Sequence, residues 1–91
     1  KKRGILLAFD ECYTAFGRLG AASGAAFFNV EPDLLLVGKA LGGGFPLSAC
    51  IGTPQVMAAW GASRGEAIHT QTFLGHPIGC ATGRAVLSLV A

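Results

Sequence analysis

Two short runs of consecutive apolar residues dominate the first half of the chain. Residues 4–9 (GILLAF) precede Asp10, and residues 34–37 (LLLV) precede Gly38 and Lys39. Short continuous apolar runs are typical of strands that are buried on both faces, as in a parallel sheet. Roughly two dozen residues separate the runs, which is enough for the crossover that parallel neighbours require. We therefore expect an α/β sheet in which 4–9 is a central strand and 34–37 runs parallel to it.

The second half of the chain predicts one more strand followed by a helix. Residues 47–52 (LSACIG) have the pattern of a third strand. Thr53 and Pro54 then have the residue types of an N-cap and a first helical position, so a helix should run from Pro54 to about Trp60. The segment 61–75 has no clear helical period, and it predicts a loop with room for a short strand.

A last helix is expected from Pro77 onward. Its apolar residues recur at intervals of three and four positions, which places them on one helix face: Ile78, Ala81, Ala85 and Leu89. No internal repeat or low-complexity linker interrupts the chain. The pattern therefore predicts that residues 1–91 belong to one domain without an internal boundary.

Composition changes the expectation of what this domain is. Apolar residues make up 52% of the 91 positions and charged residues only 13%, whereas soluble domains carry about 25% Asp, Glu, Lys and Arg. A chain this short has a large surface for its volume and should need more polar residues than a large protein. The chain also starts at Lys1 without a methionine and stops within the apolar helical run. We expect it to be a fragment of a larger protein.

Several functional classes are not supported by the sequence. The apolar content argues against disorder, and there is no run of 18 apolar residues to span a membrane. The first apolar run is short and is not followed by a cleavage site, so secretion is not expected. A net charge of +2 is too small and too scattered to predict a nucleic-acid partner. Three widely spaced cysteines, Cys12, Cys50 and Cys80, favour buried free thiols in a reducing compartment such as the cytoplasm over disulfides or a metal site.

The candidate chemistry lies where the two apolar runs end. Ligands of open α/β sheets gather at the carboxyl ends of the strands, and Asp10 and Lys39 follow the first and second runs. Taken singly, they could be a turn carboxylate and a solvated amine. A lysine in apolar surroundings, however, has its neutral form favoured, and the neutral amine condenses with aldehydes. Glycines 42–44 leave room for a bulky ligand. A phosphate loop would need Ser or Thr after the lysine and Gly at position 33, where Ala40 and Asp33 stand.

Three ordered segments resemble those of one enzyme family, the class III aminotransferases, which depend on pyridoxal 5'-phosphate. Residues 10–20 (DECYTAFGRLG) are similar to the family's Asp-Glu-x-x-Thr-Gly-x-Gly-Arg-x-Gly. Residues 32–49 (PDLLLVGKALGGGFPLSA) resemble its Pro-Asp…Gly-Lys-x-Leu-Gly-Gly-Gly-x-Pro-x-Ser-Ala segment, and residues 69–77 (HTQTFLGHP) its Thr-Phe-x-Gly-Asn-Pro block. The resemblance implies a piece of the large domain of a fold-type I enzyme, with a mostly parallel sheet and flanking helices.

The resemblance also implies roles for four residues. Asp10 would pair with the pyridine nitrogen of the cofactor and keep it protonated. Lys39 would hold the cofactor as a Schiff base and then act as general base and acid. Thr72 would bind the cofactor phosphate in the neighbouring subunit, which implies a homodimer. Tyr13 stands where many members have Gln, and it could donate a hydrogen bond to the phenolic oxygen of the cofactor.

The implied reaction moves an amino group from an amine or ω-amino acid to a 2-oxo acid. We expect the isolated fragment to be inactive, because the family's remaining site residues lie outside it. Two alternatives remain open: an aminomutase of the same fold, and a non-catalytic α/β module that binds phosphate or a nucleotide. Glu11 is expected to be a hydrogen-bond or salt-bridge partner, and His69 and His76 are expected to be ordinary polar residues rather than metal ligands.

Overall fold

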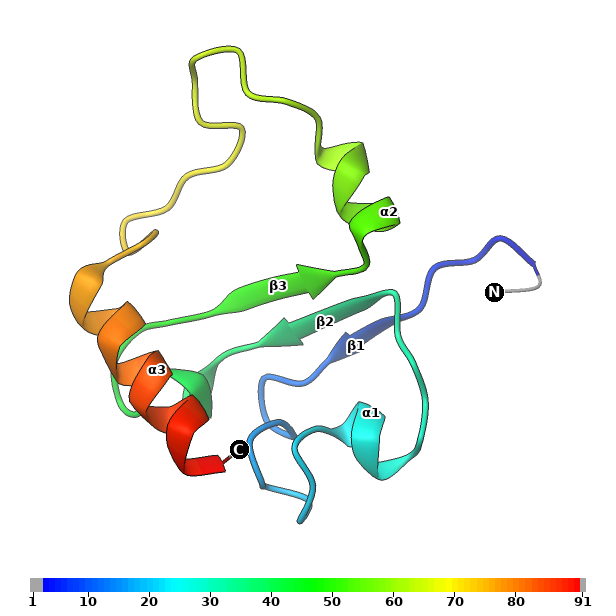
Figure 1. The fold of residues 1–91 in the computed structure, drawn as a ribbon, viewed down its shortest axis with the longest axis vertical. Coiled ribbons are helices and arrows are strands. Elements are labelled where there is room, and N and C mark those ends of the chain that lie inside the picture. Colours follow the sequence, from blue (N-terminus) through cyan, green and yellow to red (C-terminus); the bar gives the residue numbers. More distant parts are fainter. Residues whose placement is uncertain (1–2, 91) are drawn as a thin grey trace.

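The computed structural model describes residues 3–90, which form a small sheet with helices around it (Figure 1). Residues 1, 2 and 91 lie outside the described part, and with them most of the basic start of the chain and the last residue of the expected final helix. The strands are β1 (Ala8–Asp10), β2 (Leu34–Val37) and β3 (Ala49–Gly52). The α-helices are α1 (Gly24–Phe27), α2 (Pro54–Met57) and α3 (Pro77–Val90), and the two 3₁₀ turns are η1 (Lys39–Gly42) and η2 (Ala58–Trp60).

The sheet has the order β1-β2-β3 and is mixed. β1 pairs in parallel with β2, with Phe9 opposite Leu35. β3 pairs antiparallel with β2, with Ile51 opposite Leu35. The predicted α/β class and the parallel pairing of the first two strands are confirmed, and β2 has the predicted bounds.

The prediction of a central first strand is wrong within the described residues. β1 is an edge strand, and it covers only the last two residues of the run 4–9 together with Asp10. Leu7, just before β1, donates its N–H to Asp33 Oδ2 over 2.9 Å instead of to a ladder partner. Leu6, two residues before β1, is 59% exposed. An apolar run predicts that a strand is buried in the whole protein. It does not show whether the helix or strand that buries it belongs to these 91 residues.

The helix after β3 forms as predicted. Thr53 Oγ1 accepts the N–H of Val56 over 3.4 Å, and Pro54 occupies the first turn of α2. The helix tightens into η2 and ends at Trp60, before Gly61 with its positive φ of 80°. The segment 61–75 is a loop without a strand. None of the helices in residues 3–90 is long and apolar enough to cross a membrane.

α3 begins at Pro77 as predicted, and its buried residues are glycines rather than the apolar residues that share one face. Ile78 is 56% and Leu89 is 85% exposed, whereas Gly79 and Gly83 are buried. A Cβ at position 83 would lie 2.6 Å from Leu47 Cδ2, so the helix backbone approaches the preceding segment more closely than a side chain would allow. The packing face of α3 contains glycines because the helix backbone itself approaches the neighbouring segment. A pattern of hydrophobic side chains cannot reveal such a face, since glycine has no side chain.

The core lies beneath the carboxyl ends of β1 and β2. Ala15, Val37 and Leu41 form its buried centre, and the half-buried side chains packed against them are Phe16, Leu35 and Leu47. The three cysteines are free, as expected, but Cys50 and Cys80 are exposed and Cys12 is only half-buried. The core therefore joins the turn after β1, the end of β2 and η1, the three segments that position the candidate site.

Candidate active site

The parallel register of β1 and β2 brings the two predicted chemical residues to the same edge of the sheet. Asp10 is the last residue of β1, and the N–H of Glu11 after it donates to the Leu36 carbonyl of β2 over 2.8 Å. Lys39 follows the end of β2 by two residues and begins η1. Figure 1 shows both strands pointing toward α3. The sequence correctly predicted that these carboxyl ends would lie together.

Asp10 is an exposed carboxylate held by the turn that follows it. Its Oδ1 accepts the backbone N–H of Cys12 over 3.1 Å. This hydrogen bond lowers the pKa of Asp10, and a hydrogen bond with the Cys12 thiol adds to the effect; smaller contributions come from burial, which raises the pKa, and from the Lys39 charge, which lowers it. The same contact raises the pKa of the Cys12 thiol. Asp10 is therefore kept ionised beside a cysteine that remains protonated.

The contact with Cys12 was not predicted from the sequence. A signal for it exists, because an Asp side chain commonly accepts the backbone N–H two residues further along the chain. The Cys12 sulfur also lies beside Gly38, where a Cβ would meet it at 3.6 Å. Cys12 thus lies between the Asp10 carboxylate and the residue that precedes Lys39.

Lys39 has an uncommon backbone conformation and an aromatic neighbour. Its φ is 40°, in the left-handed region that residues other than glycine, Asn and Asp seldom adopt. Its Nζ lies 3.9 Å from the centroid of the Tyr13 ring. The apolar enclosure expected around this amine is not supplied by residues 3–90, since the Lys39 side chain is exposed. Backbone strain of this kind persists where the surrounding structure fixes it, and it is common at functional sites.

Thr72 is not joined by a hydrogen bond to the other three predicted site residues within the described part of the chain. It is exposed, in the turn that precedes α3, and no hydrogen bond within residues 3–90 joins it to Asp10, Tyr13 or Lys39. Its neighbours and the residues just before β3 line a small open hollow of about 250 Å³. The lining consists of Pro46, Leu47, Ser48, Gln71, Phe73, Leu74 and Gly75. The structure therefore brings together Asp10, Tyr13 and Lys39, but not Thr72.

Glu11 is a structural residue, as the sequence predicted. It is only 2% exposed, and its carboxylate accepts the Thr14 hydroxyl over 2.6 Å and the N–H groups of Gly24 and Ala25 over 2.6 and 2.7 Å. Burial acts to raise the pKa of Glu11, but the three hydrogen bonds together outweigh it and lower the pKa. Glu11 therefore fixes the crossover segment beneath the site and is not available to a ligand.

Neither histidine lies against the Asp10–Lys39 edge in the described contacts. The ring of His69 lies 6.0 Å from that of Trp60, and the ring of His76 lies 5.1 Å from that of Phe45. Across residues 3–90, no group of three or more His, Cys, Asp or Glu side chains is placed to hold a metal ion. The two histidine rings therefore lie beside aromatic rings, His69 near Trp60 and His76 near Phe45.

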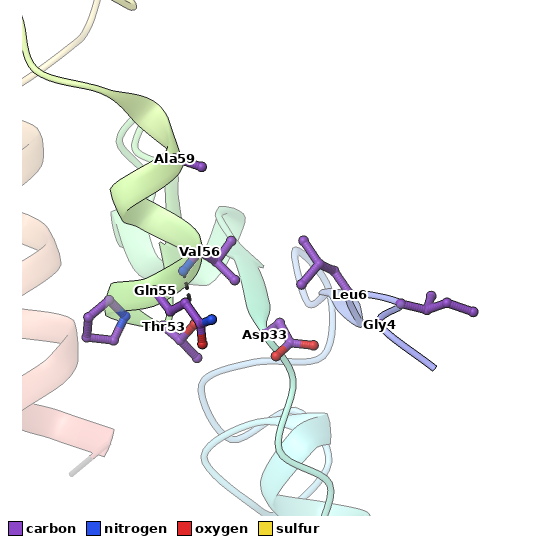
Figure 2. A pocket seen from close by; sticks show the side chains of 9 residues that line it. Gly4, Leu6, Asp33, Thr53, Gln55, Val56 and Ala59 are labelled. Carbon is purple, nitrogen blue, oxygen red and sulfur yellow. Dashed lines mark hydrogen bonds between the residues drawn. The ribbon is translucent and has the colours of Figure 1, made fainter. Parts of the chain in front are cut away.

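A larger hollow of about 830 Å³ lies at the opposite end of the sheet. Figure 2 shows Val56 and Ala59 on one side of it and Leu6 on the other, with Asp33 between them. These residues precede β1 and β2 or follow β3, so the hollow opens at the amino ends of the two parallel strands. Among residues 3–90, its lining carries one carboxylate and no lysine, and it does not include Asp10 or Lys39.

Comparisons with known proteins show which family the chain belongs to. A family model described as aminotransferase class-III matches residues 1–91. The chain is 39% identical over 89 residues to an acetylornithine aminotransferase of Brucella melitensis, covering 98% of this chain and 21% of that protein. It is 40% identical over 87 residues to a glutamate-1-semialdehyde 2,1-aminomutase of Aeropyrum pernix, covering 96% of this chain and 20% of that protein.

A solved structure has the same fold over nearly all of this chain. An (S)-enantioselective omega-transaminase from Thermomicrobium roseum superposes with a TM-score of 0.85 and 31% sequence identity, over 98% of this chain and 20% of that one. The chain thus spans about a fifth of the length of the relatives it matches. The match over all 91 residues and the shared fold identify the chain as a member of the class-III aminotransferase family.

Proposed function

We propose that this chain supplies the lysine-bearing part of the active site of an aminotransferase. The reaction would move an amino group from an amine or ω-amino acid to a 2-oxo acid. The observation that carries the proposal is the meeting of Asp10 and Lys39 at the carboxyl ends of two parallel strands, close enough for the Lys39 charge to act on the carboxylate. Class-III aminotransferases use pyridoxal phosphate, which supplies, when bound, a ring that accepts electron density from the substrate carbon.

The state of Asp10 fits a partner for a protonated ring nitrogen. The carboxylate is exposed and its pKa is lowered, so it is charged at neutral pH. Cys12 N–H uses only one lone pair of Oδ1, and an ionised carboxylate has about four acceptor positions. Asp10 can therefore accept an N–H from a ligand and stabilise its positive charge, which a neutral amide would not do.

The place of Lys39 fits the two tasks of a primary amine in this chemistry. Its Nζ is accessible at the strand edge and can form a covalent bond with an aldehyde carbon. Once released, Nζ can take a proton from the substrate carbon and return it elsewhere as general base and then general acid. Tyr13 lies beside this amine, so its hydroxyl is also proposed to contact the cofactor.

The remaining parts of the proposal concern the assembly. The exposed hydroxyl of Thr72 is available to a group outside this chain, and we propose that it binds the cofactor phosphate in the site of a neighbouring subunit. A homodimer follows from that role. Exposed free cysteines are compatible with the reducing cytoplasm, which remains the proposed location.

Chemical trapping tests the role of Lys39. The full-length protein is incubated with pyridoxal phosphate, reduced with borohydride, digested and analysed by mass spectrometry. We expect a pyridoxyl group on Lys39, no such group in Lys39→Ala, and full labelling in the control Lys2→Ala. Labelling of another lysine, or of none, would contradict the proposal and favour a module that binds phosphate without covalent chemistry.

An aminomutase is the second candidate function. It is favoured by one specific observation, the 40% identity to a protein named as a glutamate-1-semialdehyde 2,1-aminomutase. The two candidates differ in where the amino group ends. Transfer of substrate nitrogen to added pyruvate or 2-oxoglutarate supports the aminotransferase, whereas rearrangement within one molecule without net transfer supports the aminomutase.

A further inference from the structure

The Tyr13 ring lies face-on to the amine of Lys39. Nζ is 3.9 Å from the ring centroid, well within the roughly 6 Å over which an ammonium group is attracted to an aromatic face. Tyr13 comes from the turn after β1 and Lys39 from the turn after β2, so the contact joins two segments that are 26 residues apart in sequence. It is a contact between side chains that the strand order alone does not require.

Buried neighbours fix both ends of this contact. On the Tyr13 side, Ala15 is 4% exposed and its N–H donates to the Glu11 carbonyl over 3.2 Å, which closes the turn that carries the ring. On the Lys39 side, Val37 is 2% exposed and packs against Ala15 in the same core cluster. The ring and the amine are therefore held by backbones that share one core, although both side chains are exposed.

We propose that Tyr13 is a positioning residue for Lys39 that acts through the face of its ring. The ring face attracts the free ammonium group and holds it at the strand edge. This inference rests on the proposed function of Lys39 and adds to it a residue that holds the free amine in place. It also differs from a hydroxyl contact with the cofactor, because it needs the ring and not the oxygen.

Two substitutions separate the ring from the hydroxyl. Tyr13→Phe keeps the aromatic face and removes the oxygen, whereas Tyr13→Leu removes the face and keeps an apolar side chain. An exposed cation–π contact changes how strongly the ammonium group is held by a factor of about two to five. Tyr13 is 70% exposed, so neither variant should disturb the fold, and the thiol reactivity of the exposed Cys50 serves as a check.

The test measures the reactivity of the amine in the cofactor-free, full-length protein. The protein is treated briefly with acetic anhydride at a series of pH values, and acetylation of Lys39 is compared with that of Lys2 by mass spectrometry. At pH 8 we expect Tyr13→Leu to acetylate about two- to fivefold faster at Lys39 than the wild type, and Tyr13→Phe to match the wild type. The difference should disappear near pH 12, where amines are largely neutral in every variant.

The alternative outcomes are distinct. Equal rates in wild type and Tyr13→Leu at pH 8 would overturn the proposal, as would an increase of the same size in Tyr13→Phe. A ring that only shields the amine would raise the rate by one factor at every pH, and this result would also overturn it. Borohydride trapping of the wild type tests the proposed function independently. If Lys39 carries a pyridoxyl group but Tyr13→Leu does not change the acetylation rate, only the role of Tyr13 is refuted. If the acetylation rates are as expected but Lys39 carries no pyridoxyl group, only the role of Lys39 is refuted.

Discussion

Asp10 and Glu11 are consecutive carboxylates with opposite surroundings. Glu11 is buried and accepts hydrogen bonds from Thr14, Gly24 and Ala25, all within this chain. Asp10 is exposed, and its carboxylate is contacted by Cys12 and influenced by the charge of Lys39. Successive side chains at the end of a strand point to opposite sides. One sequence step therefore separates a scaffold carboxylate from a carboxylate that is free to bind a ligand.

The pKa of each carboxyl group is lowered for a different reason. In Glu11, burial opposes the charge and three hydrogen bonds overcome it, so the charged form is part of what holds the crossover segment. In Asp10, the Cys12 N–H and thiol are the main causes, and the fold does not depend on enclosing the group. The comparison indicates that charge at Glu11 contributes to stability and that charge at Asp10 is available for chemistry.

Neutralising Asp10 is expected to have the largest effect, and the effect should be on activity. Asp10→Asn removes the negative charge proposed to stabilise a protonated ring nitrogen, and loss of one preorganised electrostatic partner costs about 10²- to 10³-fold in kcat. Because Asp10 is exposed, the urea midpoint of the full-length protein should hardly change. Steady-state kinetics and urea unfolding measure the two quantities. A variant with normal kcat, or one that unfolds much more easily, would break the comparison with Glu11.

Removing the Glu11 carboxylate is expected to cost stability instead. Glu11→Ala leaves the buried N–H groups of Gly24 and Ala25 without an acceptor, and the expected loss is about 2–4 kcal/mol in the free energy of unfolding. Hydrogen exchange gives a local measurement, since these two amides should exchange faster than in the wild type.

A matched control separates this effect from simple loss of an acidic residue. Glu66 is exposed in the loop 61–75, and Glu66→Ala should change the free energy of unfolding by less than about 0.5 kcal/mol. Similar losses in the Glu11 and Glu66 variants would show that the hydrogen bonds of Glu11 do not hold the crossover.

The comparison also explains which parts of the fold were open to sequence-based prediction. The bounds of β2 and the helix from Pro54 to Trp60 were predicted correctly, because an uninterrupted apolar run and a Thr-Pro start are local signals. The packing face of α3 could not be predicted, because Gly79 and Gly83 have no side chain for a hydrophobic pattern to detect. The edge position of β1 depends on whether another strand pairs with its free side, and local sequence does not contain that information.

The candidate site divides in the same way. The placement of Asp10 and Lys39 at one edge could be predicted, since it follows from strand direction. The ring contact between Tyr13 and Lys39 could not, because it depends on turn geometry and on the positive φ of Lys39. The roles of all four residues remain predictions, and the experiments described here test those of Asp10 and Lys39 and the ring of Tyr13.

Acid should weaken the protein through Glu11. The folded-state pKa of Glu11 is lowered, so the unfolded chain binds a proton more readily than the folded one. The stability contributed by Glu11 is therefore complete above the unfolded value of about 4.3, and it is lost as the pH falls through the lower folded value. One proton changes the free energy of unfolding by at most about 1.4 kcal/mol per pH unit. Urea unfolding between pH 6 and pH 2 measures this slope. It should become shallower in Glu11→Gln. The pKa of Asp10 is also lowered in the folded state, so Asp10→Asn should make the slope shallower too, but by less because the exposed Asp10 is screened by solvent. Equal slopes in wild type and Glu11→Gln would assign the acid loss to other groups.

The smallest expected effect tests how tightly the Glu11 carboxylate is held. A Cβ at Gly24 would meet Glu11 Oε2 at 3.1 Å and Oε1 at 3.2 Å. In an unobstructed site, Gly→Ala stabilises by about 0.4–1 kcal/mol through the unfolded chain. Here the carboxylate cannot withdraw without lengthening its hydrogen bonds, so we expect Gly24→Ala to destabilise the protein by about 1 kcal/mol. Combined with Glu11→Ala, the same substitution should become neutral or stabilising, because the obstructing oxygens are gone; this is a coupling of about 1 kcal/mol in a double-mutant cycle of urea unfolding. Additive effects of the two substitutions on the free energy of unfolding would mean that the Glu11 carboxylate can move aside. Glu11 would then be held less rigidly than its hydrogen bonds indicate, and its contrast with the exposed Asp10 would be smaller.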